Sequence, residues 1–350
     1  MLNEAYQKGF KTYCLSEHVP RSKVSQLYPE EIEAGLSPSR LHQRFEEYLV
    51  EAKRCAESWK RKLNVLVGAE LENIDDECIE YLQDVLNGTA SQRESGEGRS
   101  RNQAMAGPIA GKGRVDYIIG SVHHVESIPI DFDKATLERA LDLFQLDSDY
   151  DNIQVDDDHS IFRKRAHLRL ILRYLDQQNQ VIQHFHPEII GHFDLCRLFQ
   201  PDTPMTIKAS RQITDSVCIE LLKQIDASVH KNIEFVCSYG GLFELNSASL
   251  RKGWKTPYPG EDILDIILAK GGHLCLSDDA HSHAQVGLNY QKVKYYLESK
   301  GVSDIWTLKL DDDSPVSKDC TRFPRGTVSV MISDWTSDPF WKANENPTVV

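Results

Sequence analysis

Short apolar runs alternate with longer amphipathic stretches along most of this chain. Runs of this length that carry apolar residues on both faces are typical of buried strands, and stretches with apolar residues every three to four positions are typical of helices. We expect strands at residues 11–18, 63–72, 115–124, 188–194, 242–246 and 273–281. We expect helices at residues 38–62, 160–180, 214–232, 260–270 and 284–300. This alternation predicts βα units around a parallel sheet, and therefore an α/β fold.

Two segments depart from this alternation. Residues 87–114 are rich in Gly, Ser and Arg and nearly free of large apolar side chains. Such a segment cannot bury enough surface to offset its ordering entropy, so we expect a disordered insertion there. At residues 303–350 we expect an irregular closing segment, with one strand candidate at 327–333.

Composition and charge narrow the functional classes. The chain has 350 residues, of which 40% are apolar, and a formal net charge of −13. An acidic balance argues against a nucleic-acid partner, because nucleic-acid binding needs a basic face to neutralise the phosphates of the backbone. No apolar run approaches the roughly 18 residues of a membrane span, and no secretory leader pattern is present. The eight cysteines are scattered without a CxxC pair, so we expect no disulfide framework and a cytoplasmic protein.

Side chains suited to metal chemistry stand at the carboxyl ends of the expected strands. They are His18, Glu70, His123, His192 with Asp194, and Asp279 with His281, while the strand at 242–246 contains Glu244 and Asn246. In a parallel α/β barrel these ends converge on one face, where ligands and catalytic groups gather. Imidazoles and carboxylates brought together suit Zn, Fe or Mn. Repetition of the pattern at successive strands favours a metal site over chance.

Local spacing agrees with that interpretation. Asp279 and His281 are two residues apart, so at an extended strand end both side chains point the same way. They could bind one metal or bridge two. A glycine stands shortly before the ligand candidate in several strands, which permits close backbone approach; these are Gly68, Gly120 and Gly191.

The ordered motifs resemble a known family. They are SEH at 16–18, GAELENID at 68–75, DYIIGSVHHV at 116–125, GHFDLCRLF at 191–199, FELNSASLRKG at 243–253 and SDDAH at 277–281. In this order they are similar to the motifs of the polymerase and histidinol phosphatase (PHP) superfamily. They most resemble its branch of monofunctional histidinol-phosphate phosphatases from fungi and some bacteria. The resemblance runs from about residue 8 to residue 300.

The resemblance implies a fold, a reaction and cofactors. The expected fold is a distorted (β/α)7 TIM-like barrel forming one domain over residues 1–350. Its carboxyl-terminal face would hold two or three divalent transition-metal ions (Zn, Fe or Mn). The reaction would be the hydrolysis of a small phosphate ester, L-histidinol phosphate, to L-histidinol and phosphate in histidine biosynthesis.

The resemblance also implies roles for individual residues. The metal ligands would be His18, Glu70 as the bridging carboxylate, His123, His192, Asp279 and His281. Arg197 and Arg251 resemble the arginines that hold the phosphate, with Lys252 as a neighbouring cation. Asp194 or a nearby imidazole would protonate the leaving alkoxide. Glu244, with Glu17 and Glu72, offers carboxylates to the cationic part of the substrate. Ligation by His124 is the less favoured alternative to ligation by its neighbour.

The first motif of the family is not present in this sequence. The family begins with a strand ending in HxH, and residues 1–17 contain no histidine. We therefore expect that the chain lacks one strand and loop, because of an incomplete gene model, an isoform or a real loss. We expect such a chain to bind metal weakly and to hydrolyse phosphate esters poorly. The alternatives are another PHP phosphoesterase, such as a phosphotyrosine phosphatase or a nuclease, and a non-catalytic relative that binds metal or a phosphometabolite.

Overall fold

A single curled sheet organises the molecule. The structure, a computed structural model, describes residues 1–89, 113–145, 160–210 and 213–343. The strands follow one another in space in chain order: β1 (Thr12–Leu15), β2 (Asn64–Leu71), β3 (Tyr117–Gly120), β6 (Ile189–Ile190), β7 (Leu242–Asn246), β8 (His273–Ser277), β9 (Asp304–Leu310) and β10 (Thr327–Ser333). The pairs from β1 to β9 are parallel, and β10 is antiparallel to β9. β9 also contacts β1 and β2, which shows that the sheet curls round into a distorted TIM-like barrel.

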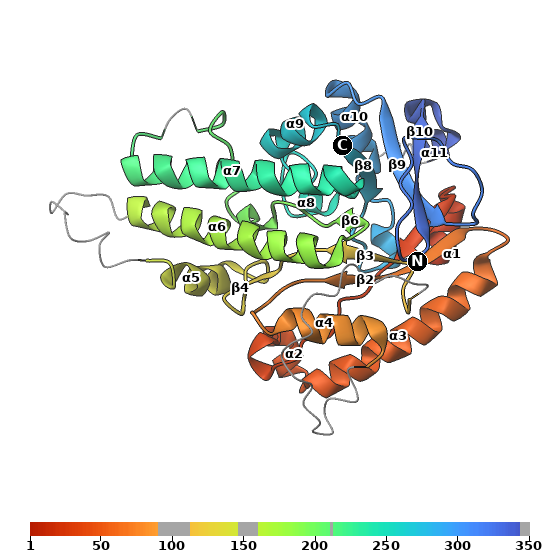
Figure 1. Cartoon of the computed structure of the whole chain (residues 1–350), viewed down its shortest axis with the longest axis horizontal. Helices are drawn as coiled ribbons and strands as arrows, with labels where there is room; N and C mark the ends of the chain where they lie inside the picture. The colour runs from red at the N-terminus through yellow and green to blue at the C-terminus, as the bar shows by residue number, and fades with distance from the viewer. Residues whose placement is uncertain (90–112, 146–159, 211–212, 344–350) are drawn as a thin grey trace.

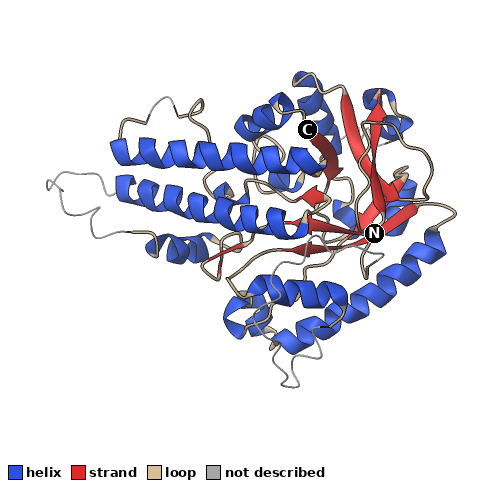
Figure 2. Cartoon of the chain, viewed as in Figure 1, coloured by secondary structure: helices blue, strands red, loops and turns tan. Residues whose placement is uncertain are grey.

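Helices connect the parallel strands and cover the outside of the sheet (Figures 1 and 2). They are α1 (Leu2–Gln7), α2 (Pro29–Glu33), α3 (Pro38–Trp59), α4 (Cys78–Asn87), α5 (Lys134–Asp142), α6 (Ser160–Phe185), α7 (Ser216–Tyr239), α8 (Ala248–Arg251), α9 (Glu261–Ala269), α10 (Tyr290–Ser299) and α11 (Pro339–Ala343). A short hairpin of β4 (His124–Val125) and β5 (Ile128–Pro129) follows β3. The two longest helices, α6 and α7, lie side by side, and each leads directly into the next strand.

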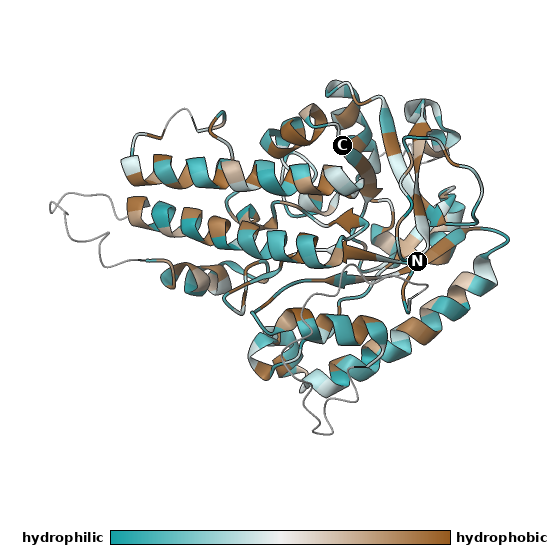
Figure 3. Ribbon diagram, viewed as in Figure 1, coloured by the Kyte–Doolittle hydropathy of each residue, from teal (hydrophilic) through white to brown (hydrophobic). Residues whose placement is uncertain are grey.

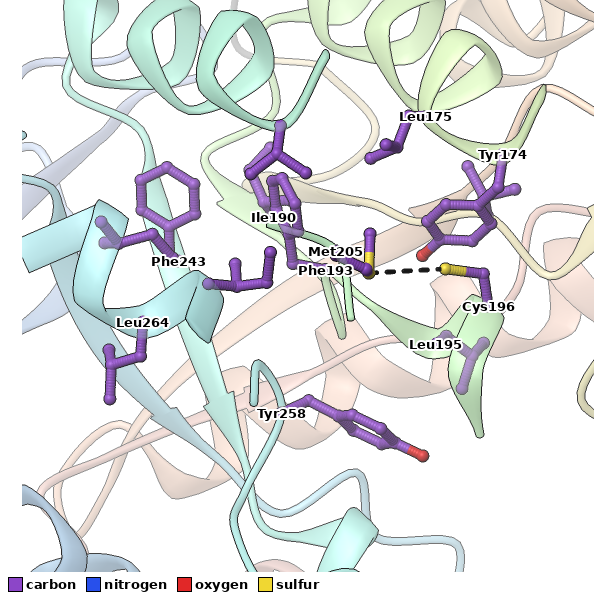
Figure 4. Packing of buried hydrophobic residues seen from close by; sticks show 14 of the residues in the cluster. Tyr174, Leu175, Ile190, Phe193, Leu195, Cys196, Met205, Phe243, Tyr258 and Leu264 are labelled. Atoms are coloured by element: carbon purple, nitrogen blue, oxygen red, sulfur yellow. Dashed lines mark hydrogen bonds between the residues drawn. The ribbon is translucent and has the colours of Figure 1, made fainter. Parts of the chain in front are cut away.

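Hydrophobic and hydrophilic positions alternate along α3, α6 and α7 in Figure 3, so each helix has a face to bury. The largest apolar cluster lies where α6 and α7 meet β6 and β7. Figure 4 shows part of it, including Tyr174 and Leu175 from α6, Phe193 after β6, and Phe243 from β7. This packing fixes the crossover helices against the sheet, and with them the loops that follow the strands.

Most of the expected elements are present, with shifted ends. The expected strand at 242–246 coincides with β7, whereas the one at 188–194 shrinks to the two residues of β6. The expected helix at 160–180 continues to Phe185, and the one at 284–300 begins as an α-helix only at Tyr290. The end shifts have a common cause, because tertiary contacts rather than local propensity decide where an element stops.

The segment from residue 303 onward is more regular than expected. The strand expected at 327–333 is β10, but β9 was not predicted, and the two pair along their whole length. The strand expected at 327–333 is therefore confirmed, and describing the segment as irregular was wrong for residues 304–310. Of the insertion expected at 87–114, residues 90–112 lie outside the described residues. All eight cysteines are free in this structure. No helix in the described parts of the chain is long and apolar enough to cross a membrane.

Candidate metal centre and active site

Strand register aligns the first ligand candidates. His18 forms a parallel bridge with Glu70, just beyond the paired part of β1 and β2. β3 and β6 pair in parallel up to their last residues, and His123 and His192 follow shortly after those points. Because parallel strands in register end at one edge, side chains from four separate chain segments meet there.

Glu70 is the centre of this group. Its Oε1 atom lies 3.4 Å from His123 Nε2 and 3.2 Å from His192 Nε2. The two Nε2 atoms are 3.0 Å apart. Ligand atoms of His18, Glu70 and His123 all lie within 4.8 Å of one another. Imidazole nitrogens and a carboxylate oxygen converging at this spacing are a donor set that fits a divalent transition metal.

The electrostatics of the cluster keep Glu70 ionised. Burial by itself raises the pKa of Glu70, but His18, His123 and His192 together hold it well below its usual range. Burial opposes charge on His123 as well, yet the carboxylates of Glu72 and Glu70 raise its pKa well above the usual value. Burial lowers the pKa of His18. Glu70 is therefore an anion with the charge a bridging ligand requires.

Close backbone approach shapes this edge of the sheet, as the glycines predicted. A Cβ on Gly191 would lie 2.2 Å from Ser121 Oγ, and a Cβ on Gly68 would lie 2.3 Å from Tyr117 Cζ. The Ser121 hydroxyl donates to Glu70 Oε1 at 2.6 Å. Gly191 therefore makes room for the hydroxyl that orients Glu70.

Asp279 and His281 lie on the loop after β8 and line a cavity of about 800 Å3 that His18, Glu70 and Glu244 also line. The Asp279 Oδ1 and His281 Nδ1 atoms are 3.6 Å apart. The His281 side chain is 70% exposed, in contrast to His123 and His192 beside Glu70, which are buried. These two residues face the same cavity as Glu70 but form its more open rim.

Arg251 supports that rim. Its Nη1 and Nη2 atoms donate to the carbonyls of Asp278 and Asp279 at 2.7 and 2.8 Å. Asp279 has a φ of 46°, a left-handed conformation that a non-glycine residue adopts only when its surroundings hold it there. The neighbouring Lys252 is exposed on the turn after α8.

Asp194 and Arg197 form a buried structural network beside the cluster. Asp194 Oδ2 accepts from Arg197 Nε and Nη2 at 2.9 and 2.7 Å and from the Gly260 amide at 2.8 Å. Arg197 is 4% exposed and also pairs with Asp262 at 2.6 Å. Burial raises the pKa of Asp194, although Arg197 opposes this. Arg197 and the Oδ2 atom of Asp194 are thus occupied by protein partners, whereas the buried Oδ1 atom of Asp194 has no hydrogen-bond partner among the described residues. Neither residue lines the cavity around Glu70.

Glu244 is buried close to the cluster. Its Oε1 atom accepts from the His192 amide and, at 2.9 Å, from Asn246 Nδ2. The carboxylate therefore fixes the backbone that carries His192. Burial raises the pKa of Glu244, and His192 counteracts it.

Sequence reasoning missed two polar residues near the site. The first is Ser121, whose role depends on a contact across strands that no spacing rule reveals. The second is Arg21, which is 8% exposed and pairs with both carboxylate oxygens of Glu31. Its guanidinium carbon lies 5.0 Å from the centre of the Tyr28 ring. Arg21 could have been identified from the sequence by its position three residues after the ligand candidate His18.

Comparison with known proteins identifies the family of this chain. The PHP domain family matches residues 1–248. The chain therefore belongs to the PHP domain family.

The chain is similar in sequence to two yeast proteins and in fold to a bacterial one. A probable histidinol-phosphatase of Schizosaccharomyces pombe is 33% identical over 314 residues, covering 89% of this chain and 84% of that protein. A histidinol-phosphatase of Saccharomyces cerevisiae is 28% identical over 361 residues, covering 97% of this chain and 93% of that protein. Among solved structures, the histidinol phosphatase candidate hisK of Listeria monocytogenes superposes with a TM-score of 0.56 and 15% identity, covering 83% of this chain and 92% of that one. This last likeness concerns the fold.

Proposed function

We propose that this protein is a metal-dependent phosphomonoesterase that hydrolyses L-histidinol phosphate to L-histidinol and phosphate. The observation that carries the proposal is the convergence of three imidazoles on the Glu70 carboxylate at the carboxyl ends of the strands. The names of the two fungal relatives support the substrate. The proposal places the protein in histidine biosynthesis.

The proposed ligands are the residues that converge on Glu70 and those on the rim of the same cavity: His18, Glu70, His123, His192, Asp279 and His281. Two or three divalent ions (Zn, Fe or Mn) would be held between them. When bound, such ions supply Lewis acidity toward a water nucleophile and toward the phosphate oxygens. Among the chain's own groups, Glu70 spans the cluster, and Ser121 keeps its carboxylate in one orientation.

The remaining predicted residues take roles that follow from their contacts. Arg251 and Lys252 sit beside the Asp279 rim and are proposed to face the substrate phosphate, whose charge a guanidinium matches well. Arg197 pairs with the Oδ2 atom of Asp194, which favours a positioning role for both. Because Asp194 already pairs with Arg197, we propose that an imidazole at the cavity, rather than Asp194, protonates the leaving alkoxide.

Substitution of the central carboxylate tests the metal-dependent mechanism. Glu70→Gln keeps the shape of the side chain but removes the charge that bridging requires. Replacing a residue that only supports a metal ligand costs about 10- to 100-fold in affinity or activity, so for a ligand itself we expect a loss of phosphate release on the order of 100-fold or more. Elemental analysis of the purified protein should show Zn, Fe or Mn in the wild type and less in the variant. Equal metal content and turnover in both proteins would contradict the mechanism.

A substrate panel tests the reaction. Phosphate release is compared between L-histidinol phosphate, a phosphotyrosine peptide and a nucleoside monophosphate at equal metal concentration. We expect the first substrate to have the highest kcat/KM. Preference for the peptide or the nucleotide would favour another PHP phosphoesterase, and metal binding without hydrolysis of any of them would favour a non-catalytic binding protein.

A further inference from the structure

A buried carboxylate lies behind the metal cluster and takes no part in it. Glu72, 7% exposed, follows Glu70 by two residues at the end of β2. Its Oε2 atom accepts the backbone amides of His123 at 2.7 Å and His124 at 3.0 Å. Its Oε1 atom lies 3.6 Å from His123 Nδ1. Glu72 thus holds the backbone of a proposed metal ligand and lies close to Nδ1 of its ring.

His123 has two different surroundings at its two ring nitrogens. The Nε2 atom faces the cluster, 3.4 Å from Glu70 Oε1 and 3.0 Å from His192 Nε2. The Nδ1 atom is buried and has no hydrogen-bond partner within ordinary distance. The nearby carboxylate oxygen on that side is Glu72 Oε1. A small movement of the ring would therefore turn this 3.6 Å approach into a hydrogen bond.

A second histidine keeps Glu72 in place. The ring of His124 is fully buried, with Nδ1 at 3.0 Å from Glu72 Oε1 and Nε2 at 3.1 Å from the carbonyl of Gln26. The Tyr28 ring packs against it edge to face at 5.2 Å between ring centres, and Tyr28 donates to Asp131 at 3.0 Å. Both nitrogens of His124 are occupied by oxygen acceptors, so neither points to the cluster around Glu70.

We infer that Glu72, fixed by His124, is the positioning residue for His123. Glu72 Oε1 accepts the Nδ1–H of His123, which selects the tautomer that presents the Nε2 lone pair to a metal beside Glu70. Histidine ligands commonly depend on such an acceptor behind the ring, which fixes both tautomer and orientation. The inference rests on the metal centre of the proposed function, and it assigns His124 to support rather than to ligation.

Metal affinity of a matched set of variants tests this role. The probes are Co2+ titrated into the metal-free protein, followed by its d–d absorption spectrum, and Zn2+ in competition. Glu72→Gln should weaken binding about 10- to 100-fold without changing the number of ions bound, and should alter the cobalt spectrum. His124→Ala should weaken it in the same direction, whereas Asp215→Ala, which removes a carboxylate at the start of α7, should leave affinity unchanged. Equal affinity and spectra in Glu72→Gln and the wild type would overturn the inference.

A measurement on the unmodified protein guards against a folding defect in the variants. With 15N-labelled histidine and bound Zn2+, His123 should show a protonated Nδ1 and a metal-bound Nε2. Binding through Nδ1, or a proton on Nε2, would overturn the inference even if every variant failed to fold. Failure of the wild type to bind Co2+ or Zn2+ would overturn both this inference and the proposed function. Metal binding with the expected tautomer but no release of phosphate would overturn the proposed function alone.

Discussion

At the residue scale, the orientation of Glu70 depends on atoms that belong to neighbouring strands. The Ser121 hydroxyl holds one carboxylate oxygen, and it fits only because residue 191 is a glycine. The histidines themselves could be predicted from their places at strand ends. The hydroxyl could not, because a serine two residues before a histidine has no pattern that separates it from an ordinary loop residue.

Gly191→Ala should therefore damage both stability and metal binding. Its new Cβ would lie 2.2 Å from Ser121 Oγ and 2.9 Å from Ile119 Cγ2, so these side chains must move. Overpacking of this kind costs about 1–3 kcal/mol of unfolding free energy, which urea denaturation would measure. Ser121→Ala is the control, because it removes the hydroxyl without a clash. It should weaken metal binding with a smaller loss of stability. Wild-type stability in Gly191→Ala would contradict the tight contact.

The pair of Asp194 and Arg197 illustrates a limit at the same scale. The motif around residues 191–199 predicted one proton donor and one phosphate ligand. In the structure these side chains face each other, and a Cβ on Gly260 would lie 2.4 Å from Arg197 Nη2. A charged side chain near a site has more than one way to satisfy its charge. Only the packing of Gly260 and Asp262 around Arg197 shows which one this fold uses.

At the element scale, the register of the parallel strands determines where the site residues lie. Contacts at the helix ends fix the crossover helices that connect these strands. Asp215 is the N-cap of α7, where its Oδ1 atom accepts the amide of Cys218 at 2.8 Å. Both its oxygens also accept from Arg165 on α6, at 3.2 and 2.7 Å. One carboxylate thus caps one crossover helix and ties it to the other.

Asp215→Ala should destabilise the protein by about 1–2 kcal/mol at neutral pH, the usual cost of a lost N-cap. The hydrogen bond from Arg165 lowers the pKa of Asp215 to about 2. A carboxyl with a folded pKa below its unfolded value stabilises the fold above the unfolded pKa, near 4, and loses that contribution as pH falls toward 2. The difference between wild type and variant should therefore narrow between pH 4 and pH 2. Urea unfolding at pH 7 and pH 3 would measure it, and a gap that widens in acid would contradict this assignment.

At the scale of the whole molecule, a buried ion pair joins the carboxyl-terminal segment to the start of β6. Arg325 Nε lies 2.7 Å from both carboxylate oxygens of Glu188, and its Nη2 donates to the carbonyl of His186 at 2.6 Å. Glu188 Oε2 also accepts the amide of Ile118 at 2.9 Å. The segment after residue 303 is thus anchored beneath the barrel, where its strands complete the sheet.

Arg325→Met should be strongly destabilising, because it leaves the buried Glu188 charge without a partner. Breaking such a pair costs about 3–5 kcal/mol. Burial raises the pKa of Glu188, and Arg325 opposes this, so the variant should have a still higher folded pKa. A carboxyl whose folded pKa lies above its unfolded value stabilises the fold at pH values below the unfolded pKa, and this contribution is lost as pH rises. The loss of stability in the variant should therefore grow from pH 4 upward.

The double variant Glu188→Gln/Arg325→Met controls for lost packing. It removes both charges and keeps an acceptor for the Ile118 amide, so it should recover much of the stability that Arg325→Met loses. Urea denaturation of the three proteins between pH 4 and pH 8 would measure the recovery. A double variant no more stable than Arg325→Met would show that packing, not the unpaired charge, causes the loss.

The amino-acid sequence by itself determined the α/β class, most of the parallel strands and the family, because strand periodicity and motif order are local properties of the chain. It also located the histidines and carboxylates that meet at Glu70, since parallel strands bring their ends to one face. Only the tertiary structure decided that β9 joins the sheet, that Arg197 is buried against Asp194, and that Glu72 and His124 stand behind His123. Those outcomes depend on contacts between residues distant in sequence. Burial there forces every polar group to find a partner, and the choice of partner is made by packing rather than by spacing.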